Sequence, residues 1–262
     1  MEINLSNLRA VVCGSSQGIG RATAIELASL GANITLLARN RERLETVANE
    51  LDVSSGQSHS VIVADFSDSN QVQEAIGQFI AAGNVAEILI NNTGGPPGGP
   101  AMTAGMDEFK VAFESHLICN QHLVQALVPG MQSRGYGRII NVISTSVKQP
   151  IMGLGVSNTI RGAVASWSKT LATELGPFGI TVNNVLPGMT QTTRLDSIIG
   201  SRAEKTGNTI EQVADAMQKE TPARRFAEPR EIAAAIAFLA SPAAAYINGI
   251  NLPVDGGRTQ CL

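Results

Sequence analysis

The chain has 262 residues, of which 44% are hydrophobic and 16% are charged, and its formal net charge is −3. This composition suits one folded domain with a sizeable core, and the mild acidity gives no attraction to nucleic acid or to an anionic membrane. The three cysteines lack metal-ligand spacing, so we expect no disulfide framework, no metal site and a cytoplasmic location. We expect neither a signal peptide nor a transmembrane helix, since no apolar run approaches about 20 residues.

The chain alternates between short apolar segments and longer amphipathic ones. Strands rich in β-branched residues are predicted at residues 9–13, 33–38, 60–64, 87–91, 137–144, 180–186 and 246–254. Helices are predicted at residues 18–30, 41–51, 67–82, 106–131, 209–220 and 228–239, and between Ser144 and the strand at 180. This alternation predicts a single-domain α/β fold over residues 1–262, with a doubly wound, mostly parallel sheet and helices on both of its faces.

The turn from the first strand into the first helix is rich in glycine. It reads Gly14-Ser15-Ser16-Gln17-Gly18-Ile19-Gly20. Glycine permits a tight turn and a close approach of the backbone to a ligand, and a helix N-terminus offers free N–H groups and partial positive charge. The spacing therefore suits a pyrophosphate, although a glycine-rich turn without a ligand has the same local pattern.

Four further motifs follow at the ends of later strands. They are Asp65-Phe66, Asn91-Asn92-Thr93-Gly94, Pro187-Gly188-Met189-Thr190-Gln191-Thr192 and Val254-Asp255-Gly256-Gly257. Together with the glycine loop, they make the chain resemble the short-chain dehydrogenase/reductase family, in particular its 3-oxoacyl-ACP-reductase-like members. The resemblance covers essentially the whole chain, in order and at the spacings of the family.

This resemblance implies a Rossmann fold, commonly of seven strands, and a homotetramer or homodimer. It also implies a mobile lid over the substrate at about residues 190–222. The expected cofactor contacts are the glycine loop of residues 14–20 and Asp65, Phe66, Asn92, Thr93, Gly94, Pro187, Gly188, Thr190 and Thr192. The loop Gly94–Pro100 would border the nicotinamide end, where it either shapes a substrate pocket or acts as a stiff connector.

The residue after the second strand indicates which nucleotide is preferred. NAD-binding sheets carry an acidic residue there, which accepts hydrogen bonds from the ribose 2′-OH. This chain has Arg39, which can bind a 2′-phosphate bidentately, whereas an acid would repel it. We therefore expect NADP(H), although relatives that prefer NADP often carry a basic residue at the position of Gln17. The alternative is that Arg39 belongs to a solvated helix start.

The catalytic positions depart from the family pattern. The family uses an Asn, Ser, Tyr and Lys tetrad, in which the tyrosine exchanges the substrate proton and the lysine lowers its pKa and holds the ribose. At the spacing of the family, the four positions here read His116, Ser144, Ser157 and Arg161. Only the serine is retained, so the resemblance supports the fold and the cofactor better than the chemistry.

The replacements have different chemical abilities. Ser157 can orient a substrate, but an aliphatic hydroxyl is a poor proton donor. Arg161 stays protonated and can hold ribose hydroxyls or an oxyanion. His116, whose unperturbed pKa is near ~6.5, is a candidate general acid, with packing on its helix as the alternative. Lys148 is a further candidate if its loop folds over the site, but we favour the interpretation that it is a surface loop lysine.

Three functions follow from these residues. The first is an NADP(H)-dependent oxidoreductase for a small carbonyl or alcohol substrate, in which Ser144 binds the substrate oxygen and His116 or a water supplies the proton. The second is a non-redox enzyme on the same frame, such as an isomerase, lyase or dehydratase. The third is a nucleotide-binding sensor or a catalytically silent partner subunit. The intact glycine loop and Arg39 argue against an absent nucleotide, the tetrad losses favour the third, and we take the first as the main hypothesis.

Overall fold

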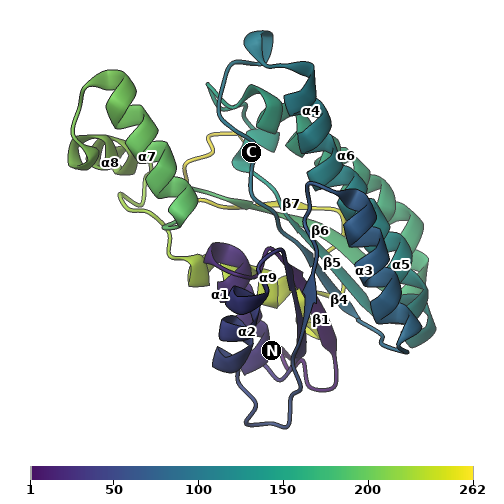
Figure 1. Ribbon diagram of the computed structural model, residues 1–262. Helices are drawn as coiled ribbons and strands as arrows, with labels where there is room; N and C mark the ends of the chain where they lie inside the picture. The colour runs from purple at the N-terminus through teal and green to yellow at the C-terminus, as the bar shows by residue number, and fades with distance from the viewer. Residues whose placement is uncertain (1, 262) are drawn as a thin grey trace.

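A seven-stranded parallel sheet forms the centre of the computed structural model, which describes residues 2–261 (Figure 1). The strand order is β3-β2-β1-β4-β5-β6-β7. The strands are β1 Arg9–Cys13, β2 Asn33–Ala38, β3 Ser60–Val63, β4 Ile88–Asn91, β5 Gly137–Val142, β6 Ile180–Pro187 and β7 Asn251–Val254. This architecture confirms the predicted single-domain doubly wound fold. The order reverses between β1 and β4, and a crevice at the carboxyl ends of the strands is expected at that point.

Helices cover both faces of the sheet (Figure 1). One face packs against α1 Gly18–Ser29, α2 Arg41–Glu50 and α9 Pro229–Ala240. The other packs against α3 Ser69–Ala81, α5 Cys119–Arg134 and α6 Gly155–Leu175. Successive residues of β1 enter opposite cores: Val12 lies in the first and Val11 in the second. Burial on both faces explains why this strand is a continuous apolar run rather than an alternating one.

The helix predicted at residues 106–131 is three pieces. It consists of α4 Met106–Phe113, a π-helical turn at Glu114–Ile118 and α5. Continuous helical periodicity gives no signal of a wider turn, so the sequence could not reveal it. Such turns are frequent at functional sites, because one extra residue turns the following side chains to a new direction. Here the turn contains His116.

Two smaller differences have local causes. Helix α3 begins at Ser69 rather than residue 67 because the Asp68 side chain caps it, accepting hydrogen bonds from the backbone N–H groups of Asn70 and Gln71. The last strand was expected over residues 246–254, but β7 is only Asn251–Val254. Gly249 before it adopts a left-handed φ of 73°, which interrupts the extended backbone.

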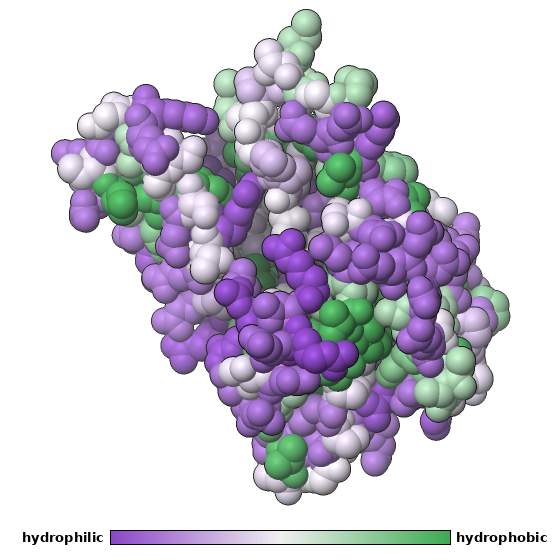
Figure 2. Space-filling model, in the orientation of Figure 1, coloured by the Kyte–Doolittle hydropathy of each residue, from purple (hydrophilic) through white to green (hydrophobic). Residues whose placement is uncertain are grey.

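The helices α7 Thr193–Thr206 and α8 Ile210–Lys219 project from the body of the molecule (Figure 1). They form a small core of their own around Leu195, Ile199, Val213 and Met217. Figure 2 shows the surface hollowed between this pair and the rest of the molecule. The predicted lid segment is therefore a separately packed helical pair beside an open cleft.

The remaining helices are short. Single 3₁₀ turns lie at Ala101–Thr103, Thr145–Val147, Gly176–Phe178 and Pro242–Ala244. Within residues 2–261, no helix combines the length and the apolar character that crossing a bilayer requires.

Candidate functional site

The glycine loop forms a tight cradle between β1 and α1. Gly14 and Gly18 have φ values of 58° and 57°, a conformation that other residues rarely adopt. A Cβ atom on Gly20 would lie 2.2 Å from the Gly14 carbonyl oxygen, so the backbone segments touch directly. The Gln17 side chain does not cap α1, which leaves the first N–H groups of the helix available. These features fit a nucleotide pyrophosphate.

Two expected cofactor residues hold the cradle in place. The buried Ser15 Oγ accepts a hydrogen bond from the Leu37 N–H at 3.1 Å and so fastens the loop to β2. The Asn92 side-chain amide donates to the carbonyl oxygens of Cys13 and Gly14 at 3.3 and 3.4 Å. Because Ser15 is fully buried, its hydroxyl orders the loop and has no surface to offer a ligand.

Arg39 is exposed directly after β2. Its side chain makes neither an ion pair nor a hydrogen bond within residues 2–261, so the guanidinium is available to a ligand. Asp65, the expected adenine contact, accepts a hydrogen bond from the Ser67 N–H at 2.9 Å. That bond is the main reason that the pKa of Asp65 is lowered, and the nearby charge of Arg39 adds to it. Phe66 beside it is half-buried against the α3–α5 core.

The catalytic positions come together from three helical elements and two strand ends. The π-helical turn directs His116 inward, where 2% of its surface is exposed. Its Nδ1 lies 2.5 Å from the Thr93 hydroxyl oxygen, just after β4. Arg161 of α6 donates from Nη1 to the Val142 carbonyl oxygen at 3.2 Å, at the end of β5. Sequence spacing therefore located residues that the structure brings to one end of the sheet.

Burial and like charge set the protonation of this group. Desolvation lowers the pKa of His116 to about 2, and the positive charge of Arg161 contributes. Desolvation also lowers the pKa of Arg161 to about 10, with a further contribution from Arg194. At neutral pH the imidazole is therefore neutral and the guanidinium is charged. The expectation that His116 is a general acid does not fit this environment, since the imidazolium form is not populated.

The two serines differ in their surroundings. Ser144 is half-buried and caps the 3₁₀ turn after β5, where its Oγ accepts a hydrogen bond from the Ser146 N–H at 3.1 Å. Its hydroxyl hydrogen remains available to a substrate oxygen. Ser157 is half-buried in the first turn of α6, four residues before Arg161 and so on the same helix face. Lys148 is half-buried after the 3₁₀ turn, beside the C-terminal Cys261.

The motif after β6 leads into the lid. Thr192 caps α7 by accepting a hydrogen bond from the Leu195 N–H at 3.4 Å, and Thr190 is buried with its hydroxyl on the Gly188 carbonyl oxygen. A Cβ on Gly188 would lie 2.6 Å from the Asp255 Cα, so only glycine fits where this turn meets the C-terminal motif. Gln17 contacts the same helix, donating to the Thr193 hydroxyl at 3.2 Å.

One site residue was missed by the sequence analysis. Arg194, in the first turn of α7, donates from Nη2 to the Pro96 carbonyl oxygen at 2.7 Å, and its charge acts on Arg161. Its position two residues after the Thr190–Thr192 motif was a usable signal, but the polar lid sequence contains a second arginine, Arg202. Only the fold shows which of them reaches the loop at residues 94–100.

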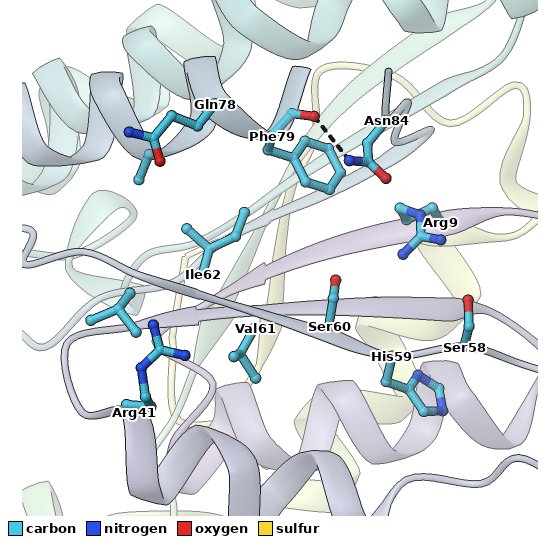
Figure 3. A pocket seen from close by; sticks show the side chains of 12 residues that line it. Arg9, Arg41, Ser58, His59, Ser60, Val61, Ile62, Gln78, Phe79 and Asn84 are labelled. Atoms are coloured by element: carbon cyan, nitrogen blue, oxygen red, sulfur yellow. Dashed lines mark hydrogen bonds between the residues drawn. The ribbon is translucent and has the colours of Figure 1, made fainter. Parts of the chain in front are cut away.

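A second hollow lies elsewhere on the molecule. An open cavity of about 500 Å³ runs along the outer edge of β3, lined by Arg9 and His59 among others (Figure 3). Figure 3 also shows Asn84 bonded to the Phe79 carbonyl oxygen at its rim. This cavity is separate from the cleft at the carboxyl ends of the strands and contains none of the expected site residues.

Comparison with known proteins places this geometry among related enzymes. The family model described as Enoyl-(Acyl carrier protein) reductase matches residues 14–259. The chain is 30% identical to gluconate 5-dehydrogenase of Gluconobacter oxydans over 99% of this chain and 97% of the relative. It is also 30% identical to 7alpha-hydroxysteroid dehydrogenase of Escherichia coli K12, with 98% of each chain covered. L-sorbose reductase from Gluconobacter frateurii, solved with NADPH and L-sorbose, superimposes with a TM-score of 0.93 at 32% identity over the full length of both chains.

Proposed function

The chain belongs to the short-chain dehydrogenase/reductase family, and from that premise we propose that it is an NADP(H)-dependent oxidoreductase acting on a small carbonyl or alcohol substrate. The observation that carries the proposal is the combination of an uncapped glycine cradle with an exposed, unpaired Arg39. The related L-sorbose reductase was solved with NADPH, which supports the choice of nucleotide.

Different residues of this chain bind different parts of NADP(H). The N–H groups of the glycine loop bind the pyrophosphate, and Arg39 binds the 2′-phosphate. Asp65 and Phe66 border the adenine, while Asn92, Thr93, Gly94, Pro187 and Gly188 surround the nicotinamide end, with Thr190 and Thr192 ordering the adjoining turn. Arg161 holds the nicotinamide ribose. When bound, the nucleotide supplies or accepts the hydride.

The catalytic side chains polarise the substrate rather than protonate it. Ser144 donates a hydrogen bond to the substrate oxygen, and Ser157 orients the substrate from the neighbouring helix. The charged Arg161 stabilises the oxygen as negative charge develops on it. A water then delivers the proton, because neither serine is a strong acid and His116 is neutral. We assign His116 the positioning role of holding the Thr93 hydroxyl at the end of β4.

The same proposal covers the organisation of the chain. We infer one dinucleotide-binding domain over residues 1–262 with the α7–α8 pair, at about residues 190–222, as its substrate lid. The open cleft in Figure 2 supports a lid that closes on the ligand. We also propose a homodimer or homotetramer, supported by exposed apolar side chains on α4 such as Met106, Val111 and Phe113.

A nucleotide-binding sensor or silent partner subunit is the second candidate. The neutral His116 and the absent tyrosine favour it, because no side chain in the site is a ready proton donor. The two functions differ in turnover but not in nucleotide binding.

The test is a titration with NADPH and with NADH, followed by nicotinamide fluorescence, and then NADPH consumption with a panel of carbonyl compounds. We expect micromolar NADPH binding, much weaker NADH binding and slow, substrate-dependent oxidation of NADPH. Binding without turnover would favour the sensor. Failure to bind either nucleotide would contradict both candidates.

A further inference from the structure

Arg161 is a buried cation with few partners. Only 7% of its surface is exposed, yet among the described residues its side chain makes a single hydrogen bond, to the neutral Val142 carbonyl oxygen. No carboxylate within residues 2–261 forms an ion pair with it. A guanidinium has five N–H donors, and leaving a buried charge uncompensated is costly. The protein alone therefore does not satisfy this residue.

Another buried arginine of the same chain, Arg138, has hydrogen-bond acceptors within the protein. Arg138 is 2% exposed and donates to three carbonyl oxygens, those of Gly137, Gly179 and Ser241. Its guanidinium also lies 4.1 Å from the centre of the Tyr136 ring. Arg138 is thus a structural cation with neutral partners around it. Arg161, by contrast, uses only one of its guanidinium N–H groups within the described protein, so its other N–H groups can donate to a ligand.

A second cation approaches the same place from the lid. Arg194 donates to the Pro96 carbonyl oxygen, and its Nη2 would lie 3.9 Å from a Cβ on Gly95. It too forms no ion pair within the described part of the chain. Its charge is close enough to act on Arg161. The two like charges repel each other, and an anion bound by both would relieve that repulsion.

We propose that the substrate carries an anionic group, a carboxylate in the simplest case, which binds between Arg161 and Arg194 while Ser144 holds its carbonyl or hydroxyl oxygen. This inference rests on the proposed oxidoreductase function. Arg161 has enough N–H donors to hold the nicotinamide ribose as well, but ribose hydroxyls are neutral and leave both guanidinium charges uncompensated, whereas a carboxylate matches the fork of an arginine. A phosphate oxygen of the nucleotide has the same chemistry, so the experiment must separate substrate from nucleotide.

Matched pairs of acids and esters test the proposal. Reduction with NADPH is measured for pyruvate, acetoacetate and 4-oxopentanoate and for their methyl esters, which keep the carbonyl and lose the charge. At least one acid is expected to exceed its ester in kcat/KM by tenfold or more. In Arg194→Ala this preference is expected to collapse through a raised KM for the acid, and Arg194→Lys is expected to restore part of it. Lys205→Ala, which removes a charge from the far end of the same helix, is expected to keep the preference.

Two binding measurements separate the possible sources of the anion. Calorimetric titration of the three acids into the wild-type protein and Arg194→Ala, with and without NADP⁺, is expected to show at least tenfold weaker acid binding in the variant. Fluorescence titration is expected to give the same NADPH affinity for both proteins. A loss of NADPH affinity with unchanged acid binding would assign Arg194 to the nucleotide and overturn the proposal.

The remaining outcomes distinguish this inference from the proposed function. Turnover of esters and acids at equal rates would overturn the anionic substrate and leave the oxidoreductase intact. Acid binding that depends on Arg194, without any turnover, would support the anion site and defeat the oxidoreductase. Absence of acid binding at millimolar concentration together with absence of turnover would defeat both.

Discussion

The two halves of the cleft differ in their composition, because backbone groups form most of one half and side chains form the other. The nucleotide half consists of backbone: the glycine cradle, the uncapped N-terminus of α1 and the turn at Gly188, each held by close contacts. The catalytic half consists of side chains, and His116, Ser157 and Arg161 all differ from the pattern that the family suggests. A backbone site depends on shape and tolerates little change, whereas side chains can be exchanged on an unchanged frame. The comparison teaches that the fold and the nucleotide site follow from the shared frame, whereas the chemistry depends on side chains whose roles are proposals.

The largest effect is expected from restoring the family residues in the catalytic half, which tests whether the two halves really differ. The double substitution Ser157→Tyr and Arg161→Lys returns a phenol and a compact ammonium to the positions of the family. If the frame has kept its geometry, carbonyl reduction should rise by about 10²–10⁴, the usual value of general-acid assistance. Steady-state rates with the carbonyl panel measure this, and Arg161→Lys alone is the control. An unchanged rate in a folded double variant would show that the pocket has been rebuilt for a different reaction.

Damaging the nucleotide half should have the next largest effect. In Gly20→Ala, the new Cβ would sit 2.2 Å from the Gly14 carbonyl oxygen, so the cradle has to shift. The shift misaligns the N–H groups of the cradle with the pyrophosphate, so we expect a clear loss of NADPH affinity in fluorescence titration. Gly77→Ala on the exposed face of α3, where a Cβ meets no atom within 4 Å, is the matched control. Equal affinities of the two variants would refute a backbone-built site.

The substitution Arg39→Asp tests the one side chain in the nucleotide half to which we assign the choice between NADPH and NADH. Loss of charge-assisted hydrogen bonds worth about 1.5–3 kcal/mol should weaken NADPH binding by about 10–100-fold. The new carboxylate should accept hydrogen bonds from the ribose hydroxyls of NADH and improve its binding. Parallel titrations with both nucleotides measure the ratio. A preference that does not change would remove Arg39 from the 2′-phosphate site.

The smallest predicted effect concerns acid stability and the buried His116. Its pKa is about 2 in the folded chain and about 6.5 when unfolded, so below pH 6.5 only the unfolded chain takes up the proton. The free energy of unfolding should therefore fall with decreasing pH by up to about 1.4 kcal/mol per unit from this residue, and by about 2 kcal/mol at pH 5. Above pH 6.5 it should contribute no pH dependence.

In His116→Asn this dependence should be absent. Urea unfolding of wild type and variant at pH 8 and pH 5 measures the difference, and His122→Asn on α5 controls for the loss of an imidazole elsewhere. Equal pH slopes in the wild type and His116→Asn would mean that His116 is protonated in the folded protein, and would revive its role as an acid.

The sequence by itself determined the alternation of strands and helices, the parallel sheet covered on both faces and the glycine-rich turn, whereas the tetrad positions stay a prediction. It could do so because apolar strand segments, helical periodicity and glycine spacing are local patterns that can be recognised in the order of residues alone. The π-helical turn at His116 and the short β7 escaped because helical and extended patterns run on through both places.

Only the tertiary structure decided the electrostatics of the site. His116 and Arg161 are named by their spacing, but burial lowers the pKa of both, and the charges of Arg161 and Arg194 add to the shifts of His116 and Arg161 respectively. Arg194 is one of two arginines in the polar lid segment, and only the position of α7 shows that it reaches Pro96. Desolvation and like-charge repulsion depend on which residues are neighbours in the folded structure. The sequence gives the residue types but not these spatial contacts.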